Sequence, residues 1–158
     1  MAAPPRVVLD TNVCLDVFVF GDADCMALRE ALRTGAMEAV TDEACRAEWL
    51  AVLEYPQLAL DAARQAEASA ACDAQLRRLP DTERGGVPVA PRLPRCRDPD
   101  DQKFLELATA CGAQWLFSRD RELLRLARRT RREHGFDILT PRAWAQLYSA
   151  AALSAKPV

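Results

Sequence analysis

The sequence predicts an α/β domain built on a mostly parallel sheet. Short apolar runs alternate along the chain with longer segments of helical periodicity, a pattern typical of such domains. The length suits a single domain over residues 1–158, with its core within about 6–142. The first apolar run, Val7-Val8-Leu9, ends directly in the carboxylate of Asp10. Because ligands of parallel sheets bind at the carboxyl ends of the strands, Asp10 is the first candidate functional residue.

The composition indicates a globular protein. Half of the residues are apolar and 28% are charged, unlike the composition of disordered chains. No apolar run approaches the ~20 residues that cross a bilayer. The first residues lack the basic start and long apolar core of a signal peptide. We therefore expect a cytoplasmic protein with no membrane segment.

Cysteine and histidine are poorly placed for metal or redox chemistry. The six cysteines form no C-x-x-C pair and stand among Ala and Leu, so we expect small buried thiols rather than disulfides or a zinc site. The single histidine, His134, lies in a basic stretch, where we expect it to be solvated. A histidine-rich metal site is excluded.

Charge is divided unevenly along the chain. Residues 1–83 carry 7 basic and 15 acidic side chains, whereas residues 84–158 carry 14 basic and 8 acidic ones. A basic half attracts polyanions. A compositional bias toward Arg, which makes up 19 of the 21 basic residues, would give the same numbers.

Caps and breakers delimit the elements of the first half of the chain. Asp22 or Asp24 can cap a helix that ends before Gly35. Pro56 ends a later helix, and the stretch after it is rich in alanine and favours helix. We expect, in order, a strand at 6–10, a helical stretch at 13–19, a helix at 24–34, a strand at 37–40, a helix at 43–54 and a helix-prone stretch at 57–79.

The second half opens with a segment rich in proline and glycine, residues 80–97. It predicts a loop rather than a domain linker, because too little chain follows to form a second core. Val87 and Val89 can add a short edge strand there. We then expect a helix at 99–111, a strand at 114–117, a helix at 120–132, a strand at 136–139 and a last helix from Pro141 to about 152.

An acid on the inward face of the helix at 99–111 is the second candidate. Asp98 followed by Pro99 marks the start of this helix, with Asp98 as the cap. Asp101 precedes Phe104 by three positions and Leu105 by four, so it lies on the stripe that faces the core. Capping does not explain an acid at that position.

The next unit repeats this arrangement. Asp120 follows the strand at 114–117 and precedes Leu123 by three positions and Leu124 by four. It therefore lies on the inward stripe of its helix. Ser118, between strand and helix, can cap the helix or donate a hydrogen bond to a carboxylate.

The helix at 43–54 offers a fourth acid. Glu48 lies three positions from Cys45 and four from Val52, beside Trp49 at the edge of the apolar face. Glu43 is explained by the helix dipole, because it stands in the first turn. Glu48 is the better functional candidate.

These acids predict metal-dependent phosphoryl chemistry. Asp10, Asp101 and Asp120 are expected to meet at one sheet edge, with Glu48 beside them. Carboxylates pressed together repel and resist ionisation, and a hard divalent cation removes that problem. Oxygen ligands without His or Cys select Mg²⁺ or Mn²⁺ over Zn²⁺. Such ions promote phosphodiester cleavage by activating water and stabilising the leaving oxygen.

Four motifs in order, "VVLDTN", "EWLAVLEYP", "RDPDDQKFLELA" and "WLFSRDRELL", resemble the PIN-domain family over about residues 6–142. The likeness is greatest to the bacterial branch described as toxin components of toxin–antitoxin systems. The resemblance implies a three-layer α/β/α fold with a mostly parallel sheet and a Mg²⁺- or Mn²⁺-dependent endoribonuclease. It also implies an RNA substrate, and it is compatible with a small antitoxin protein as partner and with a homodimer.

The resemblance also implies roles for individual residues. The catalytic, metal-binding acids of the family fall on Asp10, Glu48, Asp101 and Asp120, and Glu48 stands in the family's E-x-L-x-x-L-x-x-P context. The small polar residues of the pattern fall on Thr11 or Asn12 and on Ser118. The residues that would orient ligands or water from outside the metal ligands are Asn12, Ser118 and Asp98.

Four arginines beside Asp120 and in the stretch that follows it are candidates for RNA contacts. They are Arg119, Arg121, Arg125 and Arg128. The alternative is a solvated helix face.

Two other functions are compatible with parts of the pattern. A phosphatase that uses Asp10 as a covalent nucleophile would need an acid where this chain has Asn12. It would also need a lysine near the other acids, and the two lysines, Lys103 and Lys156, are not expected there. A non-catalytic domain that binds metal or a partner is the second alternative.

Overall fold

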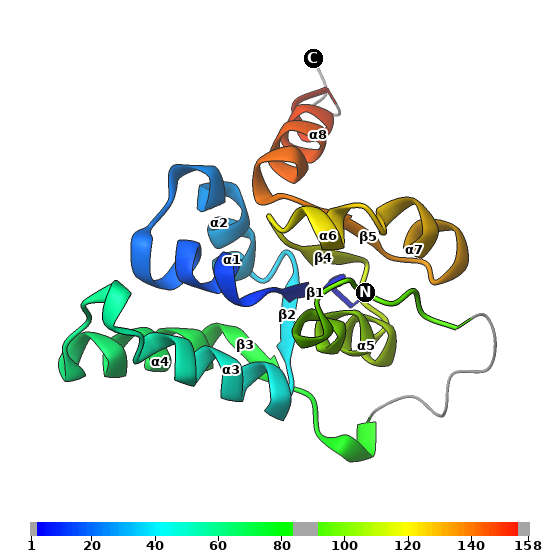
Figure 1. Ribbon diagram of the computed structural model, residues 1–158. Coiled ribbons are helices and arrows are strands. Elements are labelled where there is room, and N and C mark those ends of the chain that lie inside the picture. Colours follow the sequence, from blue (N-terminus) through cyan, green and yellow to red (C-terminus); the bar gives the residue numbers. More distant parts are fainter. Residues whose placement is uncertain (1–2, 84–91, 155–158) are drawn as a thin grey trace.

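The computed structural model describes residues 3–83 and 92–154. Five strands in these ranges form one sheet in the order β3-β2-β1-β4-β5, and every neighbouring pair is parallel. Helices cover both faces of the sheet, which gives the three-layer α/β/α arrangement that the sequence predicts (Figure 1). The strands are β1 (Arg6–Leu9), β2 (Glu38–Thr41), β3 (Leu76–Arg78), β4 (Trp115–Phe117) and β5 (Asp137–Leu139).

The helices pack through two apolar layers that follow from the alternation of side chains along the strands. Val7 and Leu9 of β1 face one layer, and Val8 faces the other. Residues of α1, α2 and α4 fill the first layer, whereas α5, α6 and α7 supply the second. The helices are α1 (Thr11–Leu15), α2 (Met26–Thr34), α3 (Glu43–Leu53), α4 (Ala62–Gln75), α5 (Gln102–Cys111), α6 (Arg121–Leu124), α7 (Ala127–Glu133) and α8 (Pro141–Ser154).

Most of the elements expected from the sequence are present, and their caps explain their bounds. Asp22, rather than Asp24, caps the short turn that leads into α2, because its carboxylate accepts a hydrogen bond from the backbone N–H of Asp24. Gly35 ends α2 with φ +78°, a conformation that favours glycine. The helical stretch near 13–19 begins earlier than expected, at Thr11, and continues after α1 as a π-helix, Asp16–Phe20.

Two expectations were wrong in detail. The helix-prone stretch 57–79 holds α4, but its last residues form the edge strand β3, which pairs with β2. Leu76 is buried there and pairing with β2 overrides its helix propensity. The helix at 120–132 is divided into α6 and α7. The edge strand expected at Val87 and Val89 lies outside the described residues.

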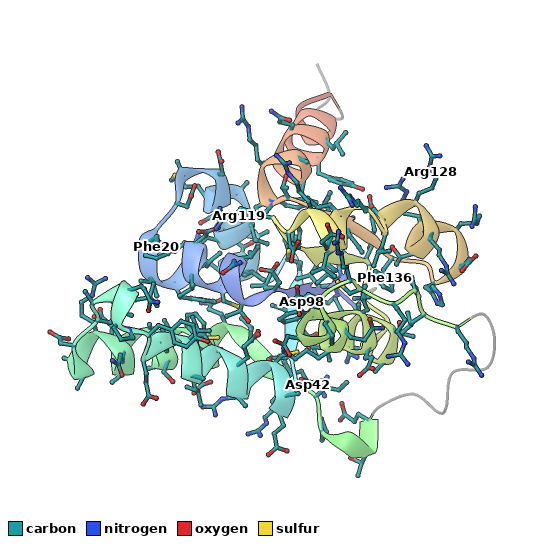
Figure 2. All side chains as sticks on the ribbon, viewed as in Figure 1. Phe20, Asp42, Asp98, Arg119, Arg128 and Phe136 are labelled. Atoms are coloured by element: carbon teal, nitrogen blue, oxygen red, sulfur yellow. The ribbon has the colours of Figure 1, made fainter. Side chains whose placement is uncertain are left out.

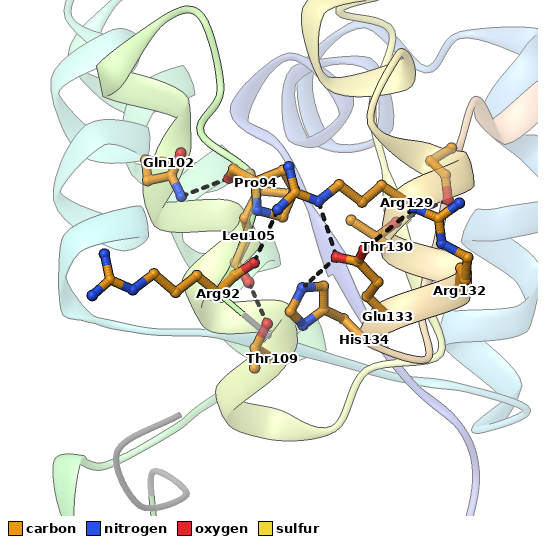
Figure 3. A network of polar contacts seen from close by, with 11 residues as sticks. Arg92, Pro94, Gln102, Leu105, Thr109, Arg129, Thr130, Arg132, Glu133 and His134 are labelled. Atoms are coloured by element: carbon orange, nitrogen blue, oxygen red, sulfur yellow. Dashed lines mark hydrogen bonds and ion pairs between the residues drawn. The ribbon is translucent and has the colours of Figure 1, made fainter. Parts of the chain in front are cut away.

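The six cysteines are free and buried, as predicted. The expectation for His134 was wrong, because its side chain is only 6% exposed and lies 3.9 Å from Glu133. Glu133 also accepts a hydrogen bond from Arg129, which contacts the backbone carbonyl of Arg92 (Figure 3). Gln102 holds the same loop through the Pro94 carbonyl. These contacts fix the segment that leads to Asp98.

No helix within residues 3–83 and 92–154 is both long and apolar enough to span a bilayer.

Candidate active site

The site forms where the first strand of the chain meets a strand made more than 100 residues later. Leu9 of β1 is in register with Phe117 of β4, and the backbone N–H of Asp10 donates to the Phe117 carbonyl at 3.0 Å. Asp10 and Ser118 therefore leave the two strands side by side, at the carboxyl edge of the sheet.

Asp10 is a buried carboxylate held at both oxygens. It is 4% exposed, its Oδ1 accepts from the Val13 N–H at 2.9 Å, and its Oδ2 accepts from the hydroxyl of Ser118. Burial raises the pKa of Asp10 to about 6, because the ionised form loses its water. The two hydrogen bonds and the charge of Arg119 act in the opposite direction and limit the rise in the pKa.

Asp101 and Asp120 bring a second and a third carboxyl to the same edge. Asp120 caps α6, and its backbone N–H donates to Ser118 Oγ at 3.0 Å. Burial raises the pKa of Asp101 to about 7, with further contributions from a hydrogen bond to Asp120 and from the charges of Asp98, Asp120 and Asp10. Both Asp120 and Asp10 thus contribute, after burial, to the raised pKa of Asp101.

Glu48 reaches the site from α3 and is held by two partners. One carboxylate oxygen accepts from the Thr11 hydroxyl, and the other lies 3.2 Å from Lys103 Nζ. The expectation that no lysine stands near the acids was therefore wrong. Lys103 follows Asp101 by two positions on the chain, and the first turn of α5 carries it across to α3.

A family model for the PIN domain matches residues 6–122. The chain belongs to the PIN-domain family. PIN domains are generally nucleases and typically depend on divalent metal ions, so the broad expectation of a nuclease is confirmed. A search of curated proteins gave no match. The matched range contains Asp10, Glu48, Asp101 and Asp120.

The structure places the residues proposed to orient ligands, Asn12, Ser118 and Asp98, in different surroundings. Asn12 is exposed, whereas Thr11, the other residue that fits the family pattern, contacts Glu48. Asp98 caps the turn before α5 by accepting from the Asp100 N–H at 3.0 Å, as its position before Pro99 predicts. Its charge is also one of the causes of the raised pKa of Asp101.

The four arginines proposed to contact RNA divide into paired and unpaired groups. Arg119 lies against Asp16, with Nε 2.7 Å from the carboxylate, and Arg125 lies 3.4 Å from Glu122. Arg121 and Arg128 are exposed and make no ion pair within the described ranges. Figure 2 shows Arg128 pointing outward from α7 and Arg119 nearer the centre of the molecule.

Sequence reasoning missed three residues of this environment: Asp16, Thr11 as the contact of Glu48, and Lys103. Asp16 is 3% exposed, and burial raises the pKa of its carboxyl despite the charge of Arg119. Its position inside the apolar run "VCLDVFVF" was a usable signal, because an acid there needs a partner. Nothing in the sequence links Glu48 to Lys103, which lies 55 positions away.

The carboxylate oxygens of the site are ligands that suit a hard divalent cation, although the side chains are not arranged around a common point. Among the residues that the structure describes, no three His, Cys, Asp or Glu side chains converge as metal ligands. The oxygens of Asp10 and Glu48 are engaged by hydrogen-bond donors instead. Burial raises the pKa of Asp101 most, and the neighbouring acids Asp98, Asp120 and Asp10 raise it further. A cation among these oxygens would relieve the repulsion between them.

Proposed function

We propose that this PIN domain is a Mg²⁺- or Mn²⁺-dependent endoribonuclease that hydrolyses RNA phosphodiester bonds. The observation that carries the proposal is that Ser118 joins Asp10 to the backbone of Asp120 at the carboxyl edge of the sheet. Asp101 lies near enough for Asp120 and Asp10 to add to the effect of burial in raising its pKa. Carboxylates that lie near one another at the carboxyl edge of a sheet repel each other, and this repulsion favours the binding of a cation.

Asp10, Glu48, Asp101 and Asp120 would hold the ion or ions. When bound, the metal supplies positive charge that favours a hydroxide nucleophile and a departing oxygen. Ser118 fixes the Asp10 carboxylate and the backbone of Asp120 together. Hydrolysis breaks one phosphorus–oxygen bond, with the hydroxyl of water going to phosphorus and its proton to the leaving oxygen.

The arginines beyond the site are the proposed phosphate contacts of the RNA. Arg121 and Arg128 are the strongest candidates, since both are exposed and neither has an acidic partner in the described ranges. Arg119 and Arg125 are weaker candidates because each already contacts an acid.

We further propose that the whole chain, 1–158, is one cytoplasmic PIN domain that acts as the toxin component of a toxin–antitoxin system. The support is the likeness of its four motifs to that branch of the family. A small antitoxin protein would then be its partner, and a homodimer is compatible with the same likeness.

The test is cleavage of a mixed single-stranded RNA pool in EDTA, Mg²⁺ or Mn²⁺, with DNA of the same sequences in parallel. Wild type is compared with Asp10→Asn. Asp61→Asn is the matched control, because Asp61 caps α4 through the Arg64 N–H just as Asp10 caps α1, but is exposed.

Metal-dependent cleavage of RNA that is lost only in Asp10→Asn supports the proposal. Equal cleavage by wild type and Asp10→Asn contradicts it. If folded wild type binds metal and cleaves nothing, the chain is a non-catalytic metal-binding domain instead.

A further inference from the structure

Lys103 is a basic side chain that contacts Glu48, one of the four acids of the site. Its Nζ is 3.2 Å from Glu48 Oε1 and also donates to the backbone carbonyl of Asp100. The side chain is 20% exposed and that of Glu48 is 29% exposed, so the pair is partly shielded from water. Such shielding strengthens the attraction relative to an ion pair on the open surface.

Lys103 differs from the other basic side chains that form ion pairs among the described residues, because its partner is one of the four acids. Arg119, which directly precedes Asp120, pairs with Asp16 and not with any of the four acids. Lys103 alone, among the ion pairs found in the described ranges, joins a basic side chain to one of them.

The residue type is informative in a chain where 19 of 21 basic residues are Arg. A guanidinium binds a carboxylate through a fixed planar fork, whereas an ammonium is a compact charge with rotatable donors that exchanges partners without rebuilding the contact. Lysine therefore suits a position where the side chain must exchange one anionic partner for another.

Both carboxylate oxygens of Glu48 already have a partner, so a metal ion would meet an occupied side chain. Thr11 donates to one oxygen and Lys103 contacts the other. A divalent ion that binds Glu48 at Oε1 competes with the ammonium, because two cations on one oxygen repel each other. The displaced ammonium keeps its tether to the Asp100 carbonyl and stays beside the site.

We propose that Lys103 neutralises Glu48 in the metal-free PIN domain and transfers to the scissile phosphate when a divalent ion takes Glu48. The proposal rests on the proposed function, since it needs both a metal and a phosphodiester. It makes Lys103 a substrate-binding residue and at the same time a competitor of the metal. A purely structural salt bridge would do neither.

The test uses Lys103→Met, which keeps the length of the side chain and removes its charge, and Lys103→Arg, which keeps the charge. Arg33→Met is the matched control, because Arg33 pairs with Glu30 on the exposed face of α2. Two quantities are measured: the Mn²⁺ dissociation constant by calorimetry without RNA, and kcat and KM for RNA cleavage at saturating Mn²⁺.

Lys103→Met is expected to bind Mn²⁺ several-fold more tightly than wild type and to cleave RNA at least about tenfold more slowly, as for the loss of a charged group at a phosphate. Lys103→Arg is expected to restore part of the cleavage rate, and Arg33→Met to match wild type in both measurements. Loss of a structural contact would instead weaken both metal binding and cleavage.

Unchanged or weaker Mn²⁺ binding in folded Lys103→Met overturns the competition with metal, and an unchanged kcat overturns the phosphate contact. Either result is distinguishable from failure of the proposed function, in which wild type itself would bind no Mn²⁺ or cleave no RNA.

Discussion

The hydroxyl of Ser118 donates a hydrogen bond to Asp10 Oδ2 across 108 positions of the sequence. Ser118 Oγ in turn accepts a hydrogen bond from the backbone N–H of Asp120. One small, fully buried side chain thus joins the acid after β1 to the acid that begins α6. The spacing of these acids therefore depends on the register of β1 against β4 and on the three residues between β4 and α6.

Asp10→Asn is expected to stabilise the metal-free protein at neutral pH. The pKa of Asp10 is raised from 3.8 to about 6, so the folded state binds this proton more tightly than the unfolded state. The stabilising contribution of the protonated Asp10 carboxyl is fully present below about pH 4 and is lost as pH rises through 6. Above pH 6 the lost contribution to the free energy of unfolding is about 3 kcal/mol, which corresponds to a shift of roughly two pKa units.

This pH dependence is measured by urea unfolding from pH 4 to 8 in EDTA. Asp10→Asn should gain on wild type by up to about 3 kcal/mol between pH 4 and pH 7. Asp61→Asn reports the effect of the same exchange at an exposed cap. A constant difference between Asp10→Asn and wild type at every pH would contradict the raised pKa.

Metal binding is expected to release protons near neutral pH. The pKa of Asp101 is raised to about 7 and that of Asp10 to about 6, and both carboxyls must lose protons to bind a cation. Mg²⁺ affinity should therefore increase as pH rises from about 5 to 8. Calorimetry at pH 6.5 in two buffers of different ionisation enthalpy counts the protons released.

Asp98→Asn provides a control for this linkage. Asparagine keeps the cap before α5 but removes a charge that raises the pKa of Asp101. The curve of affinity against pH should move to lower pH in this variant. Metal binding with no proton release in wild type would show that neither acid is a ligand.

Breaking the contact between Asp16 and Arg119 is expected to destabilise the fold. The Asp16 side chain is 5% exposed, whereas Arg119 is 55% exposed, so the contact lies between a buried and a surface ion pair. Arg119→Met leaves the acid buried and should lower the free energy of unfolding by about 1–3 kcal/mol at pH 7.5. Asp16→Asn alone should have a smaller effect.

A double-mutant cycle from urea unfolding isolates the coupling between these two side chains. The double variant should be more stable than the sum of the single effects predicts, by about 1 kcal/mol. Strictly additive effects would mean that the contact does not contribute to stability.

Removing Arg121 and Arg128 together is expected to reduce the salt dependence of RNA binding. Each phosphate contact to a single strand contributes about 0.7 to the slope of log affinity against log salt concentration. The double change to Gln should therefore flatten the slope by about 1.4, as measured by fluorescence anisotropy with Asp10→Asn to prevent cleavage.

The matched control changes Arg33 and Arg46 to Gln, which removes the same charge from residues paired with Glu30 and Asp73. Its slope should stay close to that of the parent. Equal flattening in both double variants would show that net charge, rather than a binding surface at α6 and α7, governs the interaction.

The parts of this structure that depend on local periodicity could be predicted from sequence. Asp10, Asp101 and Asp120 were selected as candidates because each stands at the start of a helix or the end of a strand with an apolar face beside it. β3 was missed, since Leu76-Arg77-Arg78 has no strand signal of its own and acquires its conformation by pairing with β2.

Contacts that join distant segments could not be predicted in the same way. Lys103 looked like an ordinary solvated residue of an amphipathic helix, and only the packing of α5 beside α3 brings it to Glu48. The choice of Thr11 over Asn12 likewise depends on which of two adjacent polar residues faces α3. Periodicity gives the face of each helix, but not its neighbour.

The central position of β1 also constrains how the chain is made. Its neighbour β4 begins at Trp115, so a ribosome completes β1, β2 and β3 long before one hydrogen-bonding edge of β1 can be covered. During that interval the nascent chain exposes an apolar strand edge, the kind of surface that chaperones shield and that aggregates otherwise. Asp10 also lacks Ser118 until then, which means that an unfinished chain carries an incomplete site.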